Sequence, residues 1–138
     1  MSTTGNATCS SSSACRSDRD DRRDVLDAYA ERINRHDFDL LTDLIAPGAT
    51  FWFSDGTHTG IAAIRTAFET TWQVIGSDEH YWLDQHQWVA DADNAAACTY
   101  RFNWKTPTAS GFGRGTTVLK RVGDRWCIVH EHLSPWPA

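Results

Sequence analysis

The chain has 138 residues, of which 41% are hydrophobic and 22% charged, as expected for one globular domain with a buried core. Its formal net charge of −5, with no dense Lys/Arg cluster outside the N-terminal stretch, argues against nucleic acid as a partner. No apolar run approaches the roughly 20 residues that a membrane-spanning helix needs. The N-terminus also lacks the features of a secretory signal, so we predict a cytoplasmic protein that does not bind membranes.

Small polar residues dominate the first part of the chain, which predicts a disordered tail over 1–18 and a single domain over 19–138. Of the four cysteines, Cys9 and Cys15 fall in this tail. Cys98 and Cys127 lie in apolar segments and are predicted to be buried free thiols. The tail pair has no second Cys/His pair at metal-ligand spacing, so no structural metal is predicted.

Helical periodicity marks the segment from about 20 to 36, where apolar residues share one face. These residues are Val25, Leu26, Tyr29 and Ile33. Asp37 is suited to cap a second, short helix that holds Leu40, Leu41, Leu44 and Ile45. Pro47-Gly48 is expected to end that helix.

A short β-type run over 50–53 precedes the turn signal Asp55-Gly56, and a third helix is predicted from about Ile61 to Gly76. Beyond residue 78 the apolar pattern changes to a period of two. This change predicts four strands, near 79–90, 95–105, 113–122 and 125–133.

Three helices followed by consecutive strands predict an α+β fold in which a strongly bent antiparallel sheet packs on the helices and encloses one apolar pocket. The glycine-rich stretch 111–115 lacks the helix N-terminus of a phosphate-binding loop, so we interpret it as a wide hairpin or bulge.

Several motifs resemble the SnoaL-like, nuclear-transport-factor-two-like superfamily. They are the Tyr29…Asn34-x-x-Asp37 helix, Ala49-Thr50 before the first strand, and Gly60 before the third helix. The ending over 126–134 (WCIVHEHLS) resembles the W-x-I-V-H-x-H-x-S ending of the branch that includes the association domain of calcium/calmodulin-dependent kinase two. The resemblance implies a cone-like half-barrel with helices closing a pocket, and dimerisation through the outer face of the sheet. It says little about the reaction.

Strand alternation divides the side chains between two faces of the sheet. The resemblance to the kinase association domain puts Arg101, Thr117 and Leu133 on the concave face, and alternation adds Glu131 and Asn103 to them. The opposite face then collects an aromatic and histidine set, too large for a monomer to expose, which predicts a sheet-to-sheet homodimer. This set is Trp82, Trp88, Tyr100, Phe102, Trp104, Trp126, His130 and His132.

Arg101 and Glu131 are the first candidates for chemistry. If both point into an apolar cavity, each needs a partner, because an unpaired buried charge is costly. Arg101 would then hold an anionic or carbonyl group while Glu131 acts as a general base. The alternative is a structural ion pair that fills the cone.

Tyr29 lies on the inward stripe of the first helix. In ketosteroid isomerases, which the resemblance includes, a tyrosine at the matching place donates to the substrate oxyanion. The catalytic Asp of those enzymes falls on Phe53 in this chain, and a phenyl ring cannot accept a proton, which argues against steroid isomerisation. A core aromatic role for Tyr29 is the alternative.

Asp55 and His58 flank the turn after the first strand and form a candidate acid–base pair at the pocket rim, although turn Asp residues often only accept backbone hydrogen bonds. His130-x-His132 with His86 has the spacing of a metal site, but we favour interface histidines and predict no metal. The predicted ligand-binding set contains seven residues. They are Arg101, Asn103, Thr117, Phe53, Ile64, Phe68 and Leu133.

Together these features predict a pocket protein for a small apolar, cyclic or carbonyl-bearing molecule. If it is an enzyme, it moves protons without a cofactor, as an isomerase, cyclase or dehydratase would, with Glu131, Tyr29, Asp55 and His58 as catalytic candidates. The alternative is a ligand-sensing or oligomerisation module without catalysis.

Overall fold

The computed structural model describes residues 18–136, so nearly all of the predicted tail, with Cys9 and Cys15, lies outside the described residues. Two α-helices, α1 (Asp18–Ile33) and α2 (Ile61–Ile75), pack on a six-stranded sheet. Within the described part, no helix is long and apolar enough to cross a membrane. Cys98 and Cys127 are free and buried, as predicted.

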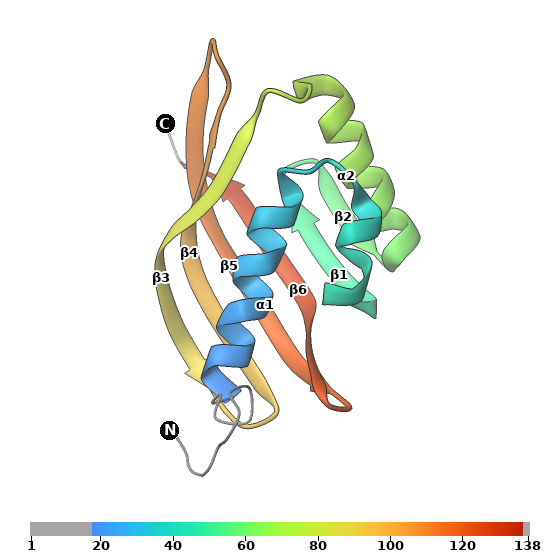
Figure 1. The fold of residues 1–138 in the computed structure, drawn as a ribbon, viewed down its shortest axis with the longest axis vertical. Helices are drawn as coiled ribbons and strands as arrows, with labels where there is room; N and C mark the ends of the chain where they lie inside the picture. Colours follow the sequence, from blue (N-terminus) through green and yellow to red (C-terminus); the bar gives the residue numbers. More distant parts are fainter. Residues whose placement is uncertain (1–17, 137–138) are drawn as a thin grey trace, which may run out of the picture.

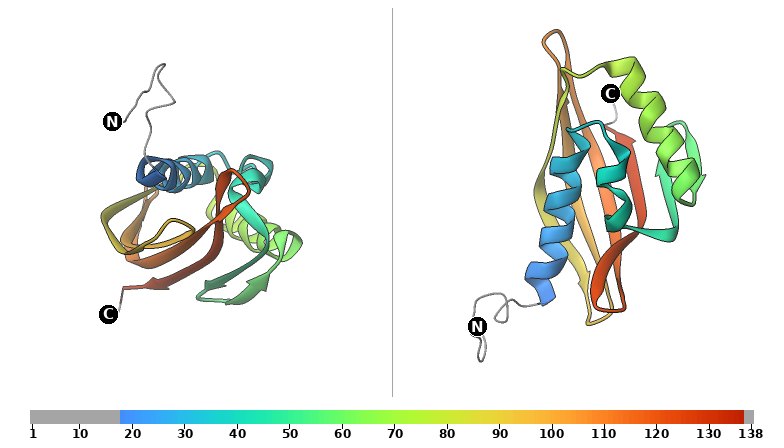
Figure 2. Two further views of the ribbon diagram at one scale, coloured as in Figure 1. Left: turned by 90° about the horizontal axis from the view of Figure 1, so that it is seen from below. Right: turned by 45° about the vertical axis from the view of Figure 1, so that its right-hand side comes forward.

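The sheet has the strand order β2-β1-β6-β5-β4-β3. Its strands are β1 (Ile45–Phe53), β2 (Gly56–Thr59), β3 (His80–Asp91), β4 (Ala95–Lys105), β5 (Ser110–Val122) and β6 (Arg125–Pro135). Four of the pairings are antiparallel, and three of them join β3, β4, β5 and β6 as predicted. The short strand β2 was not predicted, and β1 pairs with β6 in parallel. The sheet curls around the helices without closing, so the predicted half-barrel is confirmed (Figures 1 and 2).

The predicted second helix is only partly correct. Two single-turn 3-10 helices, η2 (Phe38–Leu40) and η3 (Thr42–Leu44), occupy its place, and Asp37 caps the first of them through a bond from the Asp39 backbone N–H. Ile45 already belongs to β1, where it pairs with Ile128 of β6. The β1–β6 register shifts after Ile45, and an irregular stretch of this kind tolerates Pro47, which has no N–H to donate.

The buried face of α1 agrees with the predicted stripe, since Leu26, Tyr29 and Ile33 are all in the core. One turn earlier, Arg22 is also buried. Its guanidinium forms an ion pair with Asp91 and lies 4.6 Å above the ring of Trp126. The buried face of α1 therefore runs from Arg22 to Ile33 through residues spaced three or four apart.

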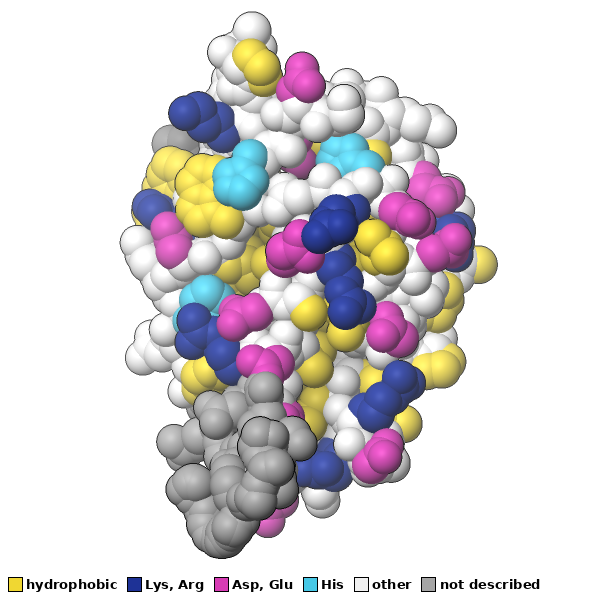
Figure 3. All heavy atoms as spheres, in the orientation of Figure 1, with side chains coloured by type: hydrophobic (Ala, Val, Ile, Leu, Met, Phe, Trp, Pro, Cys, Tyr) yellow, Lys and Arg dark blue, Asp and Glu magenta, His cyan; other side chains and the backbone are white. Residues whose placement is uncertain are grey.

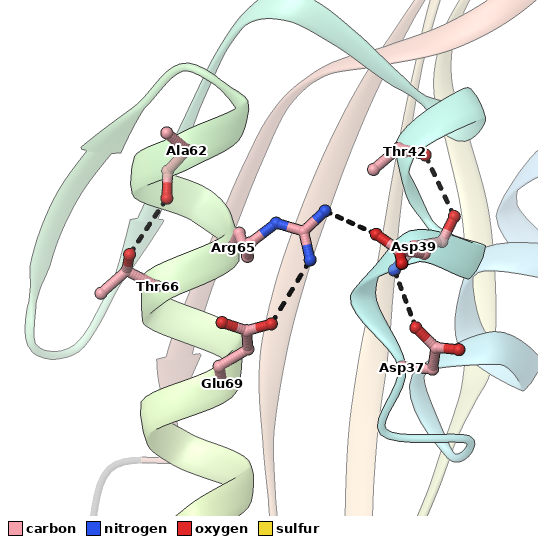
Figure 4. Close-up of polar contacts among 7 residues, drawn as sticks. All are labelled: Asp37, Asp39, Thr42, Ala62, Arg65, Thr66 and Glu69. Carbon is pink, nitrogen blue, oxygen red and sulfur yellow. Dashed lines mark hydrogen bonds and ion pairs between the residues drawn. The ribbon is translucent and has the colours of Figure 1, made fainter.

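Helix α2 covers the other end of the concave face and is held to η2 by Arg65. Its guanidinium reaches Asp39 of η2 at 2.6 Å and Glu69 on its own helix at 3.4 Å (Figure 4). The helix ends where Gly76 adopts φ +77, a left-handed conformation that glycine accepts without strain. Both boundaries match the prediction.

The glycine-rich segment is a regular strand, so its interpretation as a wide hairpin or bulge is wrong. Gly111, Gly113 and Gly115 face the concave side of β5. A Cβ atom on any of them would collide with the aromatic side chain opposite. The pairs are Gly111 with Trp104, Gly113 with Phe102 and Gly115 with Tyr100. The glycines make room for large rings to lie inside the curled sheet.

Two β-bulges change which residues face inward. In β6 the register shift between Ile128 and His130 leaves Val129 as an extra residue, so Trp126 and Ile128 point inward together with Glu131. In β3 a second shift follows Asp84, and Gln85 has φ +56. Simple alternation, on which the face assignment depended, fails at both places.

On the face of the molecule that carries the helices, acidic and basic side chains are interspersed (Figure 3). Neither sign gathers into a single large patch on this side.

Candidate functional site

A cavity of about 430 Å³ lies between the helices and the concave face of the sheet. This volume falls within the range of small-molecule sites. The helical wall comes from Tyr29 and Ile33 of α1 and from Phe68, Trp72 and Ile75 of α2. The sheet wall comes from Phe53, Tyr81, Phe102, Trp104 and Leu133. The cavity is therefore lined mainly by aromatic rings.

Glu131 lines this cavity from β6 and is only 1% exposed. The hydroxyl of Tyr29 donates to its Oε1 at 2.6 Å, and the hydroxyl of Tyr100 donates to its Oε2 at 3.0 Å. The Thr117 hydroxyl lies 2.7 Å from that of Tyr100 and extends the network into β5. Three elements far apart in the sequence thus converge on one buried carboxyl group.

Burial raises the pKa of Glu131 to about 7, because a charged carboxylate is poorly solvated inside the cavity. Hydrogen bonds from Tyr29, Tyr100 and Thr117 stabilise the charged form and act in the opposite direction. Burial also raises the pKa of both tyrosines, which keeps their hydroxyls protonated as donors. Glu131 can therefore accept and release a proton near neutral pH.

Tyr81 also lines the cavity. Its side chain is 8% exposed, and its hydroxyl has no hydrogen-bond partner within the described residues. Asn34, at the end of α1, holds the Tyr81 backbone by accepting from its N–H at 2.6 Å and donating to its carbonyl at 2.8 Å. A buried hydroxyl without a partner is costly, which makes it a natural contact for a ligand.

Polar residues mark the mouth of the cavity. Ser54 and Asp55, in the turn after β1, are exposed, and Glu79 lies half-buried just before β3. Asp55 Oδ1 lies 3.0 Å from Nε2 of His58, so the predicted pair is in contact, although only Asp55 of the two lines the cavity. Burial raises the pKa of Glu79, which has no hydrogen-bond or ion-pair partner among the described residues.

The prediction that Arg101 points into the cavity is wrong. Its guanidinium binds Asp84 through two bonds of 2.9 and 2.8 Å, and it does not line the cavity. Strand β4 alternates regularly, and the glycine gaps of β5 accept its aromatic residues, so the intervening Arg101 must face outward. The resemblance to the kinase association domain had placed Arg101 on the concave face and the aromatic residues of β4 on the outer face, which is the opposite of what the structure shows.

The other predicted ligand-binding residues divide into two groups. Phe53, Phe68 and Leu133 line the cavity as expected. Three do not reach it. Asn103 donates to the Trp82 carbonyl at 3.3 Å, Ile64 is fully buried in the core, and Thr117 lies behind Tyr100.

The composition of the predicted dimer face is likewise wrong, because most of its aromatic residues point inward. Tyr100 and Trp126 are in the core, Trp88 packs partly against it, and Phe102 and Trp104 line the cavity. His130 and His132 do face outward, where both contact the exposed ring of Trp52. Trp82, 36% exposed, remains with them on the outer surface.

The three candidate metal-binding histidines do not share a face. His86 packs against Tyr100 on the inner side, whereas the ring nitrogen Nδ1 of His130 lies 2.6 Å from the Thr50 carbonyl on the outer side. Among residues 18–136, no group of three His, Cys, Asp or Glu side chains is placed to hold a metal ion.

Sequence reasoning missed Tyr81, Glu79, Phe102 and Trp104 as cavity residues. The sequence does contain one signal for the last two. Glycines at every second position of one strand, opposite aromatics at every second position of its neighbour, indicate rings stacked over glycine and hence the inner face. The position of Tyr81 depends on Asn34, a contact across 47 residues that local pattern does not predict.

The family model described as the SnoaL-like domain matches residues 26–129. The chain belongs to this family. No curated protein matches its sequence. The SnoaL-like domain is similar in structure to a nuclear transport factor 2-like superfamily protein from Salmonella enterica, with 19% identity, a TM-score of 0.74, and coverage of 87% of this chain and 92% of that one.

Two further solved structures have the same fold. A protein of unknown function with a cystatin-like fold from Nostoc punctiforme has a TM-score of 0.78 at 9% identity, and the match covers 88% of this chain and 92% of that one. The association domain of CaMKII from C. elegans has a TM-score of 0.70 at 19% identity, with 84% and 94% covered. Identities this low show only the fold of the SnoaL-like domain, so its chemistry has to be inferred from the residues that line the cavity.

Proposed function

We propose that this SnoaL-like domain is an enzyme that moves a proton within a small apolar, carbonyl-bearing or cyclic substrate, with Glu131 as the general base. One observation carries the proposal. A carboxyl group with a pKa of about 7 lies in the wall of an aromatic cavity, which is the property that a base needs at neutral pH.

In the proposed reaction the Glu131 carboxylate takes a proton from a carbon next to the substrate carbonyl. The electron pair of that C–H bond moves toward the carbonyl oxygen and forms an enolate. The Tyr81 hydroxyl, which lacks a partner within the described residues, donates to the developing oxyanion in place of Arg101. Glu131 then returns its proton to another carbon, so the step is an isomerisation without net redox change.

Tyr29 and Tyr100 act as positioning residues in this scheme. Each donates to a different oxygen of Glu131, so the carboxylate keeps one orientation. The same contacts favour the alternative function, a binding module without catalysis, because they give both oxygens of the carboxylate a partner within the protein.

Solvent deuterium exchange tests the enzymatic proposal without knowledge of the final product. The probe is β-tetralone, a small benzo-fused cyclic ketone with acidic C–H bonds, and its exchange is followed by NMR in D₂O. We expect the protein to accelerate exchange and Glu131→Gln to slow it by about 100-fold or more. Glu31→Gln, at an exposed Glu on α1, is the matched control and should leave the rate unchanged.

Equal exchange rates with the wild type and Glu131→Gln would contradict a catalytic role for Glu131. Exchange no faster than in buffer, together with saturable binding of the ketone, would favour the binding module.

We also propose that the domain forms a homodimer through the outer face of its sheet, with a revised set of contact residues. Trp52 on β1 is 46% exposed beside His130 and His132, and Trp82 on β3 is 36% exposed. Exposed indole rings across one sheet face are typical of an interface. The cytoplasmic location stays a prediction from the sequence.

A further inference from the structure

The charged groups of the cavity are all of one sign. Glu131, Glu79 and Asp55 line it, and none of its lining residues is Lys, Arg or His. Arg101, the cation expected there, forms its ion pair with Asp84 on the outer face instead. An anionic ligand would therefore meet no positively charged side chain in the wall of this cavity.

The two carboxyl groups at the mouth differ in their partners. Asp55 has His58 beside it at 3.0 Å, whereas Glu79 has no ion-pair partner among the described residues despite being half-buried. The last turn of α2 adds to the same field. Trp72 and Ile75 of that turn line the cavity, the negative end of the helix dipole is there, and the turn carries no basic residue.

Aromatic rings surround this negative field. Phe68, Trp72, Phe102 and Trp104 line the cavity together with the tyrosines. The face of an aromatic ring attracts a cation, most strongly for indole, and the attraction increases when the cation is desolvated. The Tyr81 side chain lines the same cavity, and its buried hydroxyl has no partner among the described residues, which is an independent sign that a polar ligand group belongs nearby.

We propose that the substrate of this domain carries a positively charged nitrogen, bound among the aromatic rings near Glu79 and Asp55. The inference rests on the proposed function for the position of the reacting carbonyl, which would lie deeper, beside Tyr81 and Glu131. The charge selectivity itself concerns binding and does not depend on turnover.

A matched series of probes tests the charge preference. Benzyltrimethylammonium, its uncharged carbon isostere neopentylbenzene, and the anion phenylpropanoate have similar size and differ in charge. Because Trp72 and Trp104 line the cavity, quenching of intrinsic tryptophan fluorescence reports binding, and calorimetry confirms it. We expect the cation to bind about 10-fold more tightly than the isostere and the anion to bind more weakly than both.

Glu79→Gln should reduce the preference for the cation over the isostere by about 3- to 10-fold. Asp93→Asn, in the turn between β3 and β4 and outside the cavity, is the matched control and should leave the preference unchanged. Far-UV circular dichroism checks that both variants fold.

Three results would overturn the proposal: equal affinity for the cation and its isostere, tighter binding of phenylpropanoate, or no binding of the cation at millimolar concentration. Failure of the deuterium-exchange experiment alone would leave the charge preference standing, since the binding series involves no chemical step.

Discussion

Glu131 shows how one residue acquires its properties from burial. A carboxyl group with a raised pKa binds its proton more tightly in the folded state than in the unfolded chain. The folded protein therefore loses stability as pH rises and this proton must leave. This loss occurs between about pH 4.5, the ordinary pKa of a glutamate, and about pH 7, the pKa of Glu131 in the folded state.

We predict that Glu131→Gln removes this pH dependence. Relative to the variant, the wild type should lose about 3 kcal/mol of unfolding free energy between pH 4.5 and pH 8, which follows from the raised pKa of about 7. Urea denaturation of both proteins across that range measures the difference. Parallel plots of unfolding free energy against pH for the two proteins would contradict the raised pKa.

Tyr29→Phe removes a hydrogen-bond donor to the Glu131 carboxylate, so the loss of stability should extend to higher pH in this variant.

Substitution of Tyr81 should slow the proposed reaction, whereas substitution of Arg101 should not. Tyr81→Phe should slow ketone exchange by about 10- to 100-fold, because it removes the donor to the oxyanion while keeping the ring in place. Arg101→Ala should leave both the exchange rate and probe affinity unchanged, because its guanidinium binds Asp84 outside the cavity. A loss of binding in Arg101→Ala without a loss of folding would restore the prediction made from the sequence.

At the scale of elements, the glycines of β5 decide which face of β4 is inside. We predict that Gly113→Ala destabilises the fold by about 1–3 kcal/mol, because overpacking forces neighbours out of position. Its Cβ would lie 2.5 Å from the Phe102 ring and closer still to the Ser134 carbonyl oxygen, which as backbone cannot move aside easily. Chemical denaturation measures the loss.

Gly48→Ala is the control for this prediction. A Cβ at Gly48 in β1 would meet nothing within 4 Å, so the same change of residue should cost less than about 0.5 kcal/mol. Equal effects at both glycines would mean that backbone entropy, and not the ring beside Gly113, sets the cost.

The bulges in β3 and β6 are the other element-scale feature that local pattern did not predict. Val129 inserts one residue, so Ile128 and Glu131 share the inner face although their spacing is odd. An extra residue at the end of the apolar run over 126–129 leaves no trace in hydropathy. It becomes visible only from the partner strand, where Leu119 and Val118 pair with Ile128 and His130.

At the scale of the whole molecule, the proposed dimer predicts a mass twice the 15.5 kDa of one chain by light scattering after size exclusion. Trp52→Lys should shift the protein toward monomer, because it places a charge among the exposed rings of the outer face. Val74→Lys is the matched control, since Val74 is 81% exposed on α2, away from the sheet. A wild-type protein that is monomeric at tens of micromolar would contradict the proposal.

The sequence by itself determined the order of the two α-helices and of β3 to β6, most of their boundaries, the inward stripe of α1 and the family to which the chain belongs, because hydropathy periods and capping residues are local. It also singled out Glu131 and Tyr29. Only the tertiary structure brought those two side chains together, turned Arg101 outward and placed Tyr81 in the cavity. These outcomes depend on bulges, on ring-over-glycine packing and on contacts between distant strands, which are properties of pairs of segments and not of either segment alone.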